Sequence, residues 1–162
     1  AYATEFDVKV GLTEQANFNA FVKKIIELDT SKKIQKLLWS SYPTAIRLLL
    51  DNKYVFSPFW EYQKGNKTQE EWQEEFKSAK QTSHAALANQ NTASVLGVVL
   101  SRIYVLRNQL VHGGATWQGK LNREQIRDCN ALMDELVPLI IELMMDNPQT
   151  LWGDANYPPL TK

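Results

Sequence analysis

The stretch TASVLGVVLSRIYVLRNQLVHGG, residues 92–114, joins a long apolar run to a polar end and a pair of glycines. Apolar residues dominate it from Val95 to Leu106. Thr92 is of a residue type that caps helix N-termini, and Gly113 is of the type that ends helices in the left-handed conformation. The stretch therefore predicts one helix over 93–112, with His112 in its last turn.

Three polar side chains, Arg107, Asn108 and His112, follow the apolar run. Asn108 and His112 are four residues apart, so they lie one above the other on one helix face. Arg107 and His112 lie about 7.5 Å apart along the axis and about 140° apart around it. A long arginine can therefore fold back to share a pocket mouth with the imidazole without stacking on it. The helix dipole favours a protonated His112 and the charge of Arg107 opposes it, and the sequence leaves open which effect is larger.

The pattern Arg-Asn-x-x-x-His-Gly, late in an apolar helix of a small helical protein, resembles the signature of the HEPN superfamily. These helical domains occur in toxin–antitoxin, CRISPR-associated and other RNA-cleaving systems. In active members the arginine and histidine form a metal-independent ribonuclease site, usually completed across a dimer interface. The resemblance implies a catalytic set of Arg107, Asn108 and His112. Members paired with a nucleotidyltransferase antitoxin carry a tyrosine two residues after the histidine, and Gly114 at this position disfavours that subgroup.

The resemblance also implies a role for each residue and a homodimer. His112 would transfer protons around the attacking 2′-hydroxyl or the departing 5′-oxygen, and Arg107 would clamp the scissile phosphate. Asn108 would orient the imidazole or bind phosphate. One protomer offers one histidine at the site, whereas two facing protomers supply both an acid and a base. A broad apolar arc on the motif helix suits burial on two faces, one of them a subunit contact; its members are Val95, Leu96, Val98, Val99, Leu100 and Ile103.

Two other interpretations of the motif remain open at this point. One is a non-catalytic HEPN-like module that binds a nucleotide or a protein and works with a partner subunit. The net charge of zero, from 18 basic and 18 acidic residues, favours it slightly, because avid non-specific RNA binding needs a basic surface. The other is chance resemblance, in which Asn108 and His112 satisfy helix-end carbonyls and Arg107 pairs with an acid on a neighbouring helix.

Basic residues concentrate around the motif. Between 102 and 127 five of them stand against one acid, Glu124; they are Arg102, Arg107, Lys120, Arg123 and Arg127. We predict that Arg102, Lys120 and Arg123 bind substrate and that Trp117 flanks the site. For Lys120, Arg123 and Arg127 alone, a solvated helix face is the simpler interpretation, and Trp117 is also placed to seal its loop onto the core.

The rest of the chain is typical of a helical bundle. Apolar residues recur at three-and-four spacing in 13–49 and 123–146. Pro43 predicts a kink or a new helix start, Thr68 with Glu71 forms a capping box, and Asn122 with Gln125 predicts the start of the last helix. The segment 81–92 is ambiguous. We predict an all-α bundle of four or five main helices in antiparallel packing, with 93–112 lying lengthwise against 123–146.

The predicted organisation is one domain over 1–162, with an extended arm at 1–11 and a loose tail at 148–162. The connection 51–67 carries five aromatic residues between 54 and 62. They suit base stacking or a partner, but more often such residues plug the end of a bundle. The last interpretation is preferred here.

Other chemistry finds little support in the composition. His84 and His112 are isolated in sequence and Cys129 is the one cysteine, so we expect no metal site and no cofactor. A single thiol without a disulfide partner suits a reducing cytoplasm, and its apolar neighbours suggest that it is buried. The apolar segment 136–145 is too short to span a bilayer and is interrupted by Pro138 and Glu142, and no signal peptide is visible. A cytoplasmic protein without a membrane partner is expected.

Overall fold

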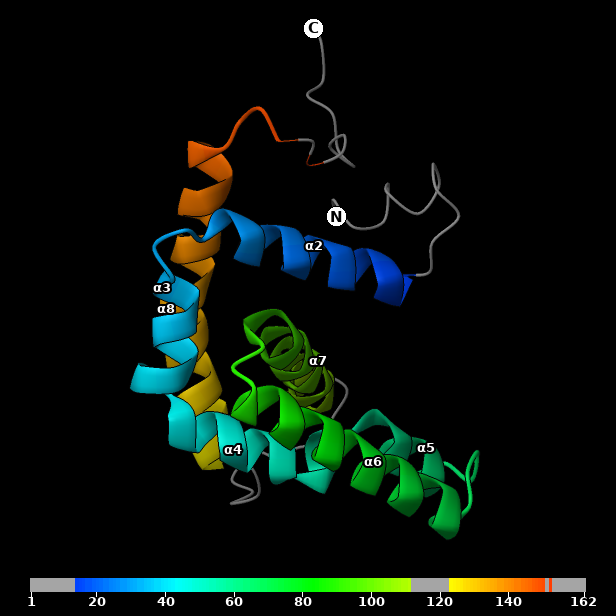
Figure 1. The fold of residues 1–162 in the computed structure, drawn as a ribbon. Helices are drawn as coiled ribbons and strands as arrows, with labels where there is room; N and C mark the ends of the chain where they lie inside the picture. The colour runs from blue at the N-terminus through cyan, green and yellow to red at the C-terminus, as the bar shows by residue number, and fades with distance from the viewer. Residues whose placement is uncertain (1–13, 112–122, 151, 153–162) are drawn as a thin grey trace, which may run out of the picture.

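The structure, a computed structural model, describes residues 14–111, 123–150 and 152, and this part of the chain is helical without strands. It contains seven α-helices, shown in Figure 1, together with a π-helical turn at Leu37–Ser41 and a 3₁₀ turn at Lys53–Val55. The all-α class predicted from sequence is confirmed. The helices are α2 (Glu14–Leu28), α3 (Lys33–Lys36), α4 (Pro43–Asp51), α5 (Ser57–Gln63), α6 (Gln69–Ala88), α7 (Thr92–Val111) and α8 (Arg123–Asp146).

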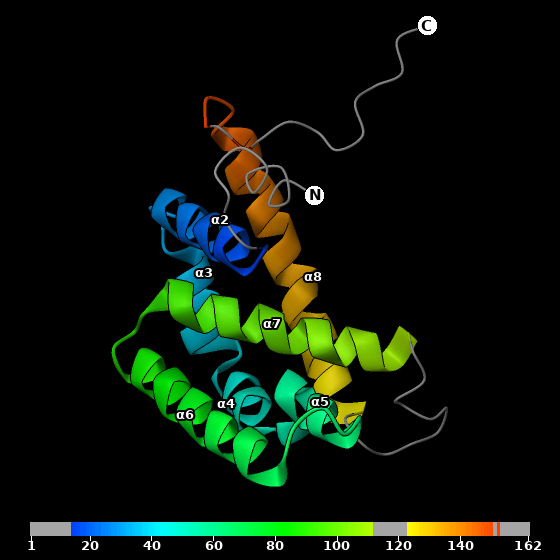
Figure 2. The ribbon, with the colours of Figure 1, turned by 90° about the vertical axis from the view of Figure 1, so that its right-hand side faces the viewer.

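Helix α7 lies at the centre of the described fold. Figure 2 shows α2 above it and α4 and α6 below it, and α7 packs against all three. The apolar arc on α7 is therefore covered within the protomer: Val95, Leu96 and Val99 are buried, and Val98, Leu100 and Ile103 pack against the same core. The arc thus gives no support to a subunit contact.

The predicted lengthwise packing of 93–112 against 123–146 is wrong. Helix α8 runs across α7 at a steep angle (Figures 1 and 2) and packs mainly against α2, α3 and α4. The apolar faces of α7 are already occupied by α2, α4 and α6, so α8 buries Cys129, Leu132 and Leu136 against the helices at the side of the bundle.

The start signals read from sequence place several helices correctly. α4 begins at Pro43, which occupies the first turn, where its missing N–H costs nothing. α6 begins after the capping box, in which Thr68 Oγ1 accepts from Glu71 N at 3.2 Å and Glu71 Oε2 accepts from Thr68 N at 2.7 Å. The ambiguous segment from 81 continues α6 to Ala88.

Two predicted caps need correction. The residue that caps α7 is Asn91, whose Oδ1 accepts from Ser94 N at 3.1 Å, and Thr92 is already inside the helix. Gln125, expected to help cap the last helix, donates to Leu48 O at 3.3 Å and accepts a hydrogen bond from Asn52. Asn122 lies outside the described residues.

The aromatic connection is more ordered than expected, since 57–63 forms helix α5. Its aromatic rings pack together: Phe59 lies edge-on to Tyr54, Trp60 and Trp72 at centroid distances of 5.2–5.4 Å. These rings close the end of the bundle between α5 and α6, as the preferred interpretation predicts.

The two ends of the chain are described only in part. The predicted arm at 1–11 lies outside the described residues, as does most of the predicted tail. Trp152 is held, however: its ring meets Phe21 of α2 edge-on at 6.4 Å and its Nε1 donates to Asn147 O at 3.1 Å. Within the described part, no helix has the length and apolar character needed to cross a membrane.

The capping box supports a direct test of stability. Thr68→Ala removes the side-chain acceptor for Glu71 N, and we expect it to lower the free energy of unfolding by about 1 kcal/mol. Urea denaturation followed by circular dichroism measures the loss. Thr68→Ser is the matched control because it keeps the hydroxyl, and an alanine variant as stable as the serine variant would contradict the assignment.

Candidate functional site

The motif residues that the structure describes lie in the last two turns of α7. Arg107 is exposed and Asn108 is half-buried, and Arg107 Nη1 donates to Asn108 Oδ1 at 3.1 Å. Among the described residues Arg107 forms no salt bridge. The pairing with an acid on a neighbouring helix, expected if the motif has only a structural role, is therefore not found in this part of the chain.

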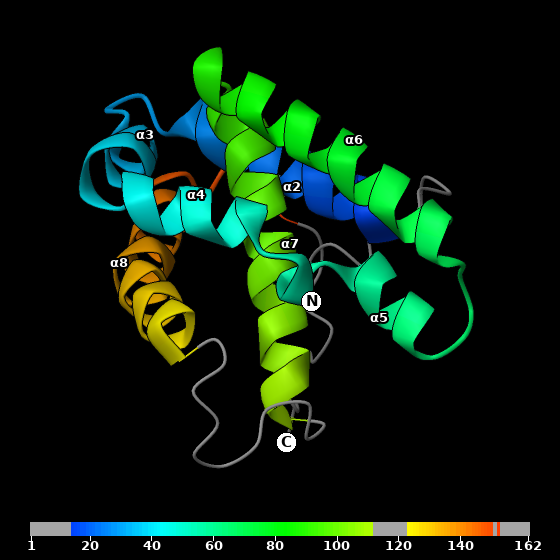
Figure 3. The ribbon, with the colours of Figure 1, turned by 90° about the horizontal axis from the view of Figure 1, so that it is seen from below.

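The remaining predicted site residues fall into two groups. His112, Trp117 and Lys120 lie outside the described residues, so the distance between the guanidinium and the imidazole stays a prediction. Arg123 is the first residue of α8 and is exposed. Helix α7 ends and α8 begins on the same side of the molecule (Figures 2 and 3), so Arg107 and Arg123 belong to one end of the fold.

Arg102, predicted to bind substrate, is instead inside the fold with 4 % of its surface exposed. Its guanidinium lies over the ring of Phe56, with 4.4 Å from Cζ to the ring centroid, and 5.9 Å from that of Phe76. Its Nη1 donates to Val55 O at 3.4 Å. Burial lowers the pKa of Arg102 to about 10, so it remains charged at neutral pH. We therefore assign Arg102 a structural role and leave it out of the candidate site.

A second buried polar residue of α7, Gln109, also forms a hydrogen bond with the 3₁₀ turn at 53–55. Gln109 donates from Nε2 to Tyr54 O, and the indole Nε1 of Trp60 donates to this carbonyl at 2.7 Å. Side chains from α7 and α5 thus donate hydrogen bonds to the carbonyls of Tyr54 and Val55 in the 3₁₀ turn, as backbone groups removed from water require. The clamp by Arg102 and Gln109 holds this turn against the half of α7 that carries the motif.

The sequence contained a signal for this placement. Val95, Val99, Arg102, Leu106 and Gln109 follow one another at spacings of four, three, four and three, which puts them on one helix face. Three of the five are aliphatic and buried. An arginine and a glutamine on such a stripe are expected to be buried with hydrogen-bond partners.

Apolar side chains surround Arg107 on the exposed side of α7. Tyr104 is 63 % exposed, Leu110 49 % and Val111 59 %. Tyr104, Arg107 and Val111 lie at spacings of three and four, so they share a helix face. We call Tyr104, Leu110 and Val111 the α7 apolar patch. Together with Arg107, it forms the exposed side of the C-terminal half of α7 among the described residues.

The second histidine lies elsewhere. His84 of α6 is half-exposed, and its Nε2 is 2.9 Å from Asp51 Oδ1, which also accepts from Lys80 at 3.0 Å. Partial burial raises the pKa of Asp51, but the hydrogen bonds from His84 and Lys80 outweigh it and the pKa falls below its ordinary value. This ion-pair cluster joins α4 to α6, and we assign it no catalytic role.

Neither a metal site nor a reactive thiol is formed by the described residues. Within residues 14–111, 123–150 and 152, no three potential ligands among His, Cys, Asp and Glu come together to hold a metal ion. Cys129 is buried, and burial raises the pKa of its thiol to about 11. A thiol with such a pKa is protonated at neutral pH and is a poor nucleophile.

Comparison of the chain with known proteins found no matching family model, no matching curated protein and no matching solved structure.

Proposed function

We propose that the protein is a metal-independent endoribonuclease of HEPN type, with a composite site formed by Arg107, Asn108 and His112 of two protomers. The observation that carries the proposal is the placement of Arg107 at the end of the central helix. It is exposed, it forms no ion pair among the described residues, and Asn108 accepts a hydrogen bond from it. A guanidinium in this state is ready to bind a phosphate in a fork geometry.

The arrangement suggests a role for Asn108 in addition to those implied by the resemblance. Its Oδ1 accepts a hydrogen bond from the guanidinium of Arg107, so it restrains the rotation of a long side chain that has no other polar partner among the described residues. In the proposed mechanism Arg107 stabilises the charge that develops on the phosphate oxygens. His112 moves the proton of the 2′-hydroxyl or of the leaving 5′-oxygen. Arg123, at the same end of the fold, adds positive charge near the path of the RNA.

The proposed chemistry predicts how cleavage responds to chelators and which ends it leaves. Attack by the 2′-hydroxyl of RNA gives 2′,3′-cyclic phosphate or 3′-phosphate ends and needs no metal ion. We expect cleavage of a labelled single-stranded RNA to continue unchanged in excess EDTA, with end groups identified by phosphatase treatment and mass spectrometry. Abolition by EDTA that added Mg²⁺ reverses would contradict the mechanism.

The α7 apolar patch offers a surface for the proposed homodimer. Contact between two copies of this patch would bring both copies of Arg107 to one place, as an isologous interface requires. We expect the 18.6 kDa chain to show twice its mass in light scattering at micromolar concentration. Val111→Lys, at a 59 % exposed position, should shift it to the monomer by placing like charges opposite each other.

The control for this substitution is Leu48→Lys. Leu48 is 55 % exposed and lies on α4, outside the α7 apolar patch, so its replacement should leave the mass unchanged. A wild-type protein that stays monomeric would leave the composite site without support.

A non-catalytic module is the second candidate. The burial of Arg102 favours it, because this arginine is then not available to a broad RNA-binding surface. With Arg102 assigned to the interior, Arg107 and Arg123 are the described basic residues of the predicted site. A protein that binds a nucleotide or a partner through Arg107 but cleaves no RNA would support this second candidate.

A further inference from the structure

The end of α7 that carries the motif exposes most of its side chains. Of residues 107–111, the last that the structure describes in this helix, only Gln109 is buried; Arg107 is exposed and Asn108 is half-buried. The last carbonyls of a helix have no acceptor role inside it, and helix ends fray readily. The orientation of the turn that carries Arg107 and Asn108 therefore depends on how Gln109 is held.

Gln109 is held by a backbone carbonyl outside its own helix. Its Nε2 donates to Tyr54 O in the 3₁₀ turn, and Trp60 of α5 donates to the same oxygen from Nε1 at 2.7 Å. Both lone pairs of this carbonyl are thus used. The chain from α4 through the turn to α5 crosses α7 (Figure 3). The hydrogen bond therefore ties the end of α7 to a segment that is distant in sequence.

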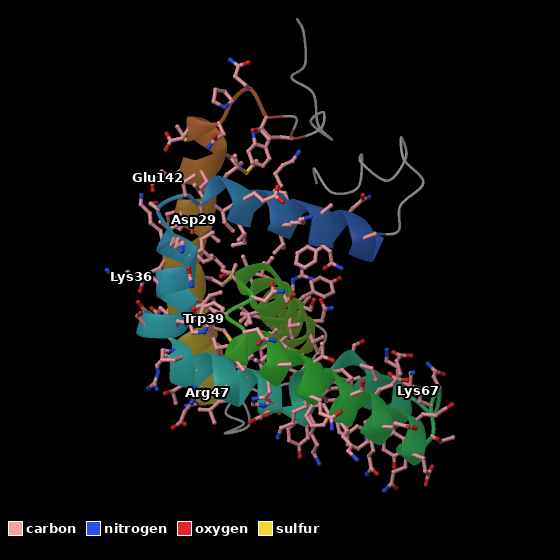
Figure 4. The ribbon with its side chains drawn as sticks, in the orientation of Figure 1. Asp29, Lys36, Trp39, Arg47, Lys67 and Glu142 are labelled. Atoms are coloured by element: carbon pink, nitrogen blue, oxygen red, sulfur yellow. The ribbon has the colours of Figure 1, made fainter. Side chains whose placement is uncertain are left out.

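The segment that carries this carbonyl is itself fixed by packed aromatic rings. Trp60 lies edge-on to Phe59 at 5.4 Å, and Phe59 lies edge-on to Trp72 of α6 at 5.2 Å. These rings belong to the end of the fold formed by α5, α6 and their connection, where Figure 4 labels Lys67. The acceptor for Gln109 is therefore anchored in the packed part of the protein.

We propose that Gln109 is a positioning residue for the candidate site. Through Tyr54 O, which Trp60 also holds, it keeps the last turns of α7 in the orientation that presents Arg107 and Asn108 to RNA. This inference rests on the proposed function, and Gln109 itself touches no substrate. A displacement of about 1 Å in a catalytic group can cost about 10²-fold in rate, so a residue that only aligns the phosphate clamp has a large effect on cleavage.

Gln109→Met tests the structural half of the proposal without RNA. Methionine is unbranched, of similar size and a good helix former, but it donates no hydrogen bond. Trp60 still donates to Tyr54 O, so no buried carbonyl loses its last partner and the midpoint of urea denaturation should change little. In hydrogen exchange measured by NMR on the full chain, the amides of 109–111 should exchange about three- to tenfold faster, as expected for loss of one hydrogen bond.

Gln125→Met is the matched control for this measurement. It makes the same replacement at a glutamine of α8 that also donates to a backbone carbonyl, Leu48 O at 3.3 Å. Exchange of the amides of 109–111 should change by less than about twofold in this variant, because Gln125 is not bonded to the turn at 53–55.

The kinetics of RNA cleavage test the functional half. In Gln109→Met we expect kcat to fall at least about tenfold while KM changes by less than about threefold. Arg107 keeps its charge and still attracts the RNA, but its guanidinium is no longer aligned with the phosphate. A residue that served stability alone would leave kcat of the folded protein unchanged.

Three results would overturn the proposal. These are unchanged exchange of the amides of 109–111 in Gln109→Met, exchange that rises equally throughout the fold, and faster exchange at 109–111 with an unchanged kcat. A wild-type protein that cleaves no RNA would instead refute the proposed function. The exchange measurement would then still decide whether Gln109 holds the end of α7, so the two failures are distinguishable.

Discussion

His112→Ala is expected to lower the rate of RNA cleavage by about 10²- to 10⁴-fold, the range typical for loss of a general acid or base. Each protomer supplies one histidine to the proposed composite site, so a homodimer of the variant lacks both proton-transfer groups. The measurement is initial cleavage rate on a defined single-stranded RNA, with far-UV circular dichroism as the control for folding. A variant as active as the wild type would overturn the mechanism.

Arg107→Ala belongs to the same experiment and should also be severe, because the phosphate loses its charged clamp. Arg107→Lys keeps the charge but loses the fork geometry and the planar contact to Asn108, so we expect it to recover only part of the rate. Arg102→Met is the matched control, since it removes a neighbouring arginine of the same helix that the structure places in the interior. If Arg102→Met abolished cleavage in a folded protein, the structural role given to Arg102 would be wrong.

The second large effect concerns stability. Arg102→Ala is expected to lower the free energy of unfolding by about 3 kcal/mol, within the range of large-to-small changes in a core. It removes the cation–π contacts with Phe56 and Phe76, leaves a cavity between α7 and α6, and takes away the donor to Val55 O. Guanidinium chloride denaturation measures the change.

Arg102→Met separates packing from charge at this position. Methionine restores much of the lost volume and places no charge in the interior, so we expect its stability to lie within about 1.5 kcal/mol of the wild type. If both variants lost an equally small amount of unfolding free energy, Arg102 would contribute little to packing. That result would contradict its structural role in holding the 3₁₀ turn against α7.

Local signals in the sequence were sufficient for much of the secondary structure. The capping box at Thr68 and the proline at 43 act within one turn of helix, so their effect does not depend on distant contacts. Helix α5 is absent from the sequence prediction, which has 51–67 as a connection, although Pro58 in the first turn is compatible with a helix. The segment from 81 is ambiguous in the sequence because serine, threonine and asparagine have only modest helix propensity, and tertiary packing decides such segments.

The arrangement of the helices could not be read in the same way. A helix that is apolar over a broad arc can be covered by a neighbouring helix or by another subunit, and the sequence of 93–112 does not distinguish them. The structure fills that arc with α2, α4 and α6 and leaves the α7 apolar patch open instead. Arg102 and Arg107 illustrate the same point, since two arginines five residues apart on one helix have opposite environments.

The central position of α7 has a consequence for the order of folding. α6 and α7 are joined by residues 89–91 alone and pack on each other, so their contacts close short loops and incur a small entropy loss. Contacts of α7 with α2 and α4 close longer loops. We therefore expect the α6–α7 hairpin to form the folding nucleus. Substitutions such as Val99→Ala would then slow folding, whereas Leu136→Ala in α8 would mainly speed unfolding.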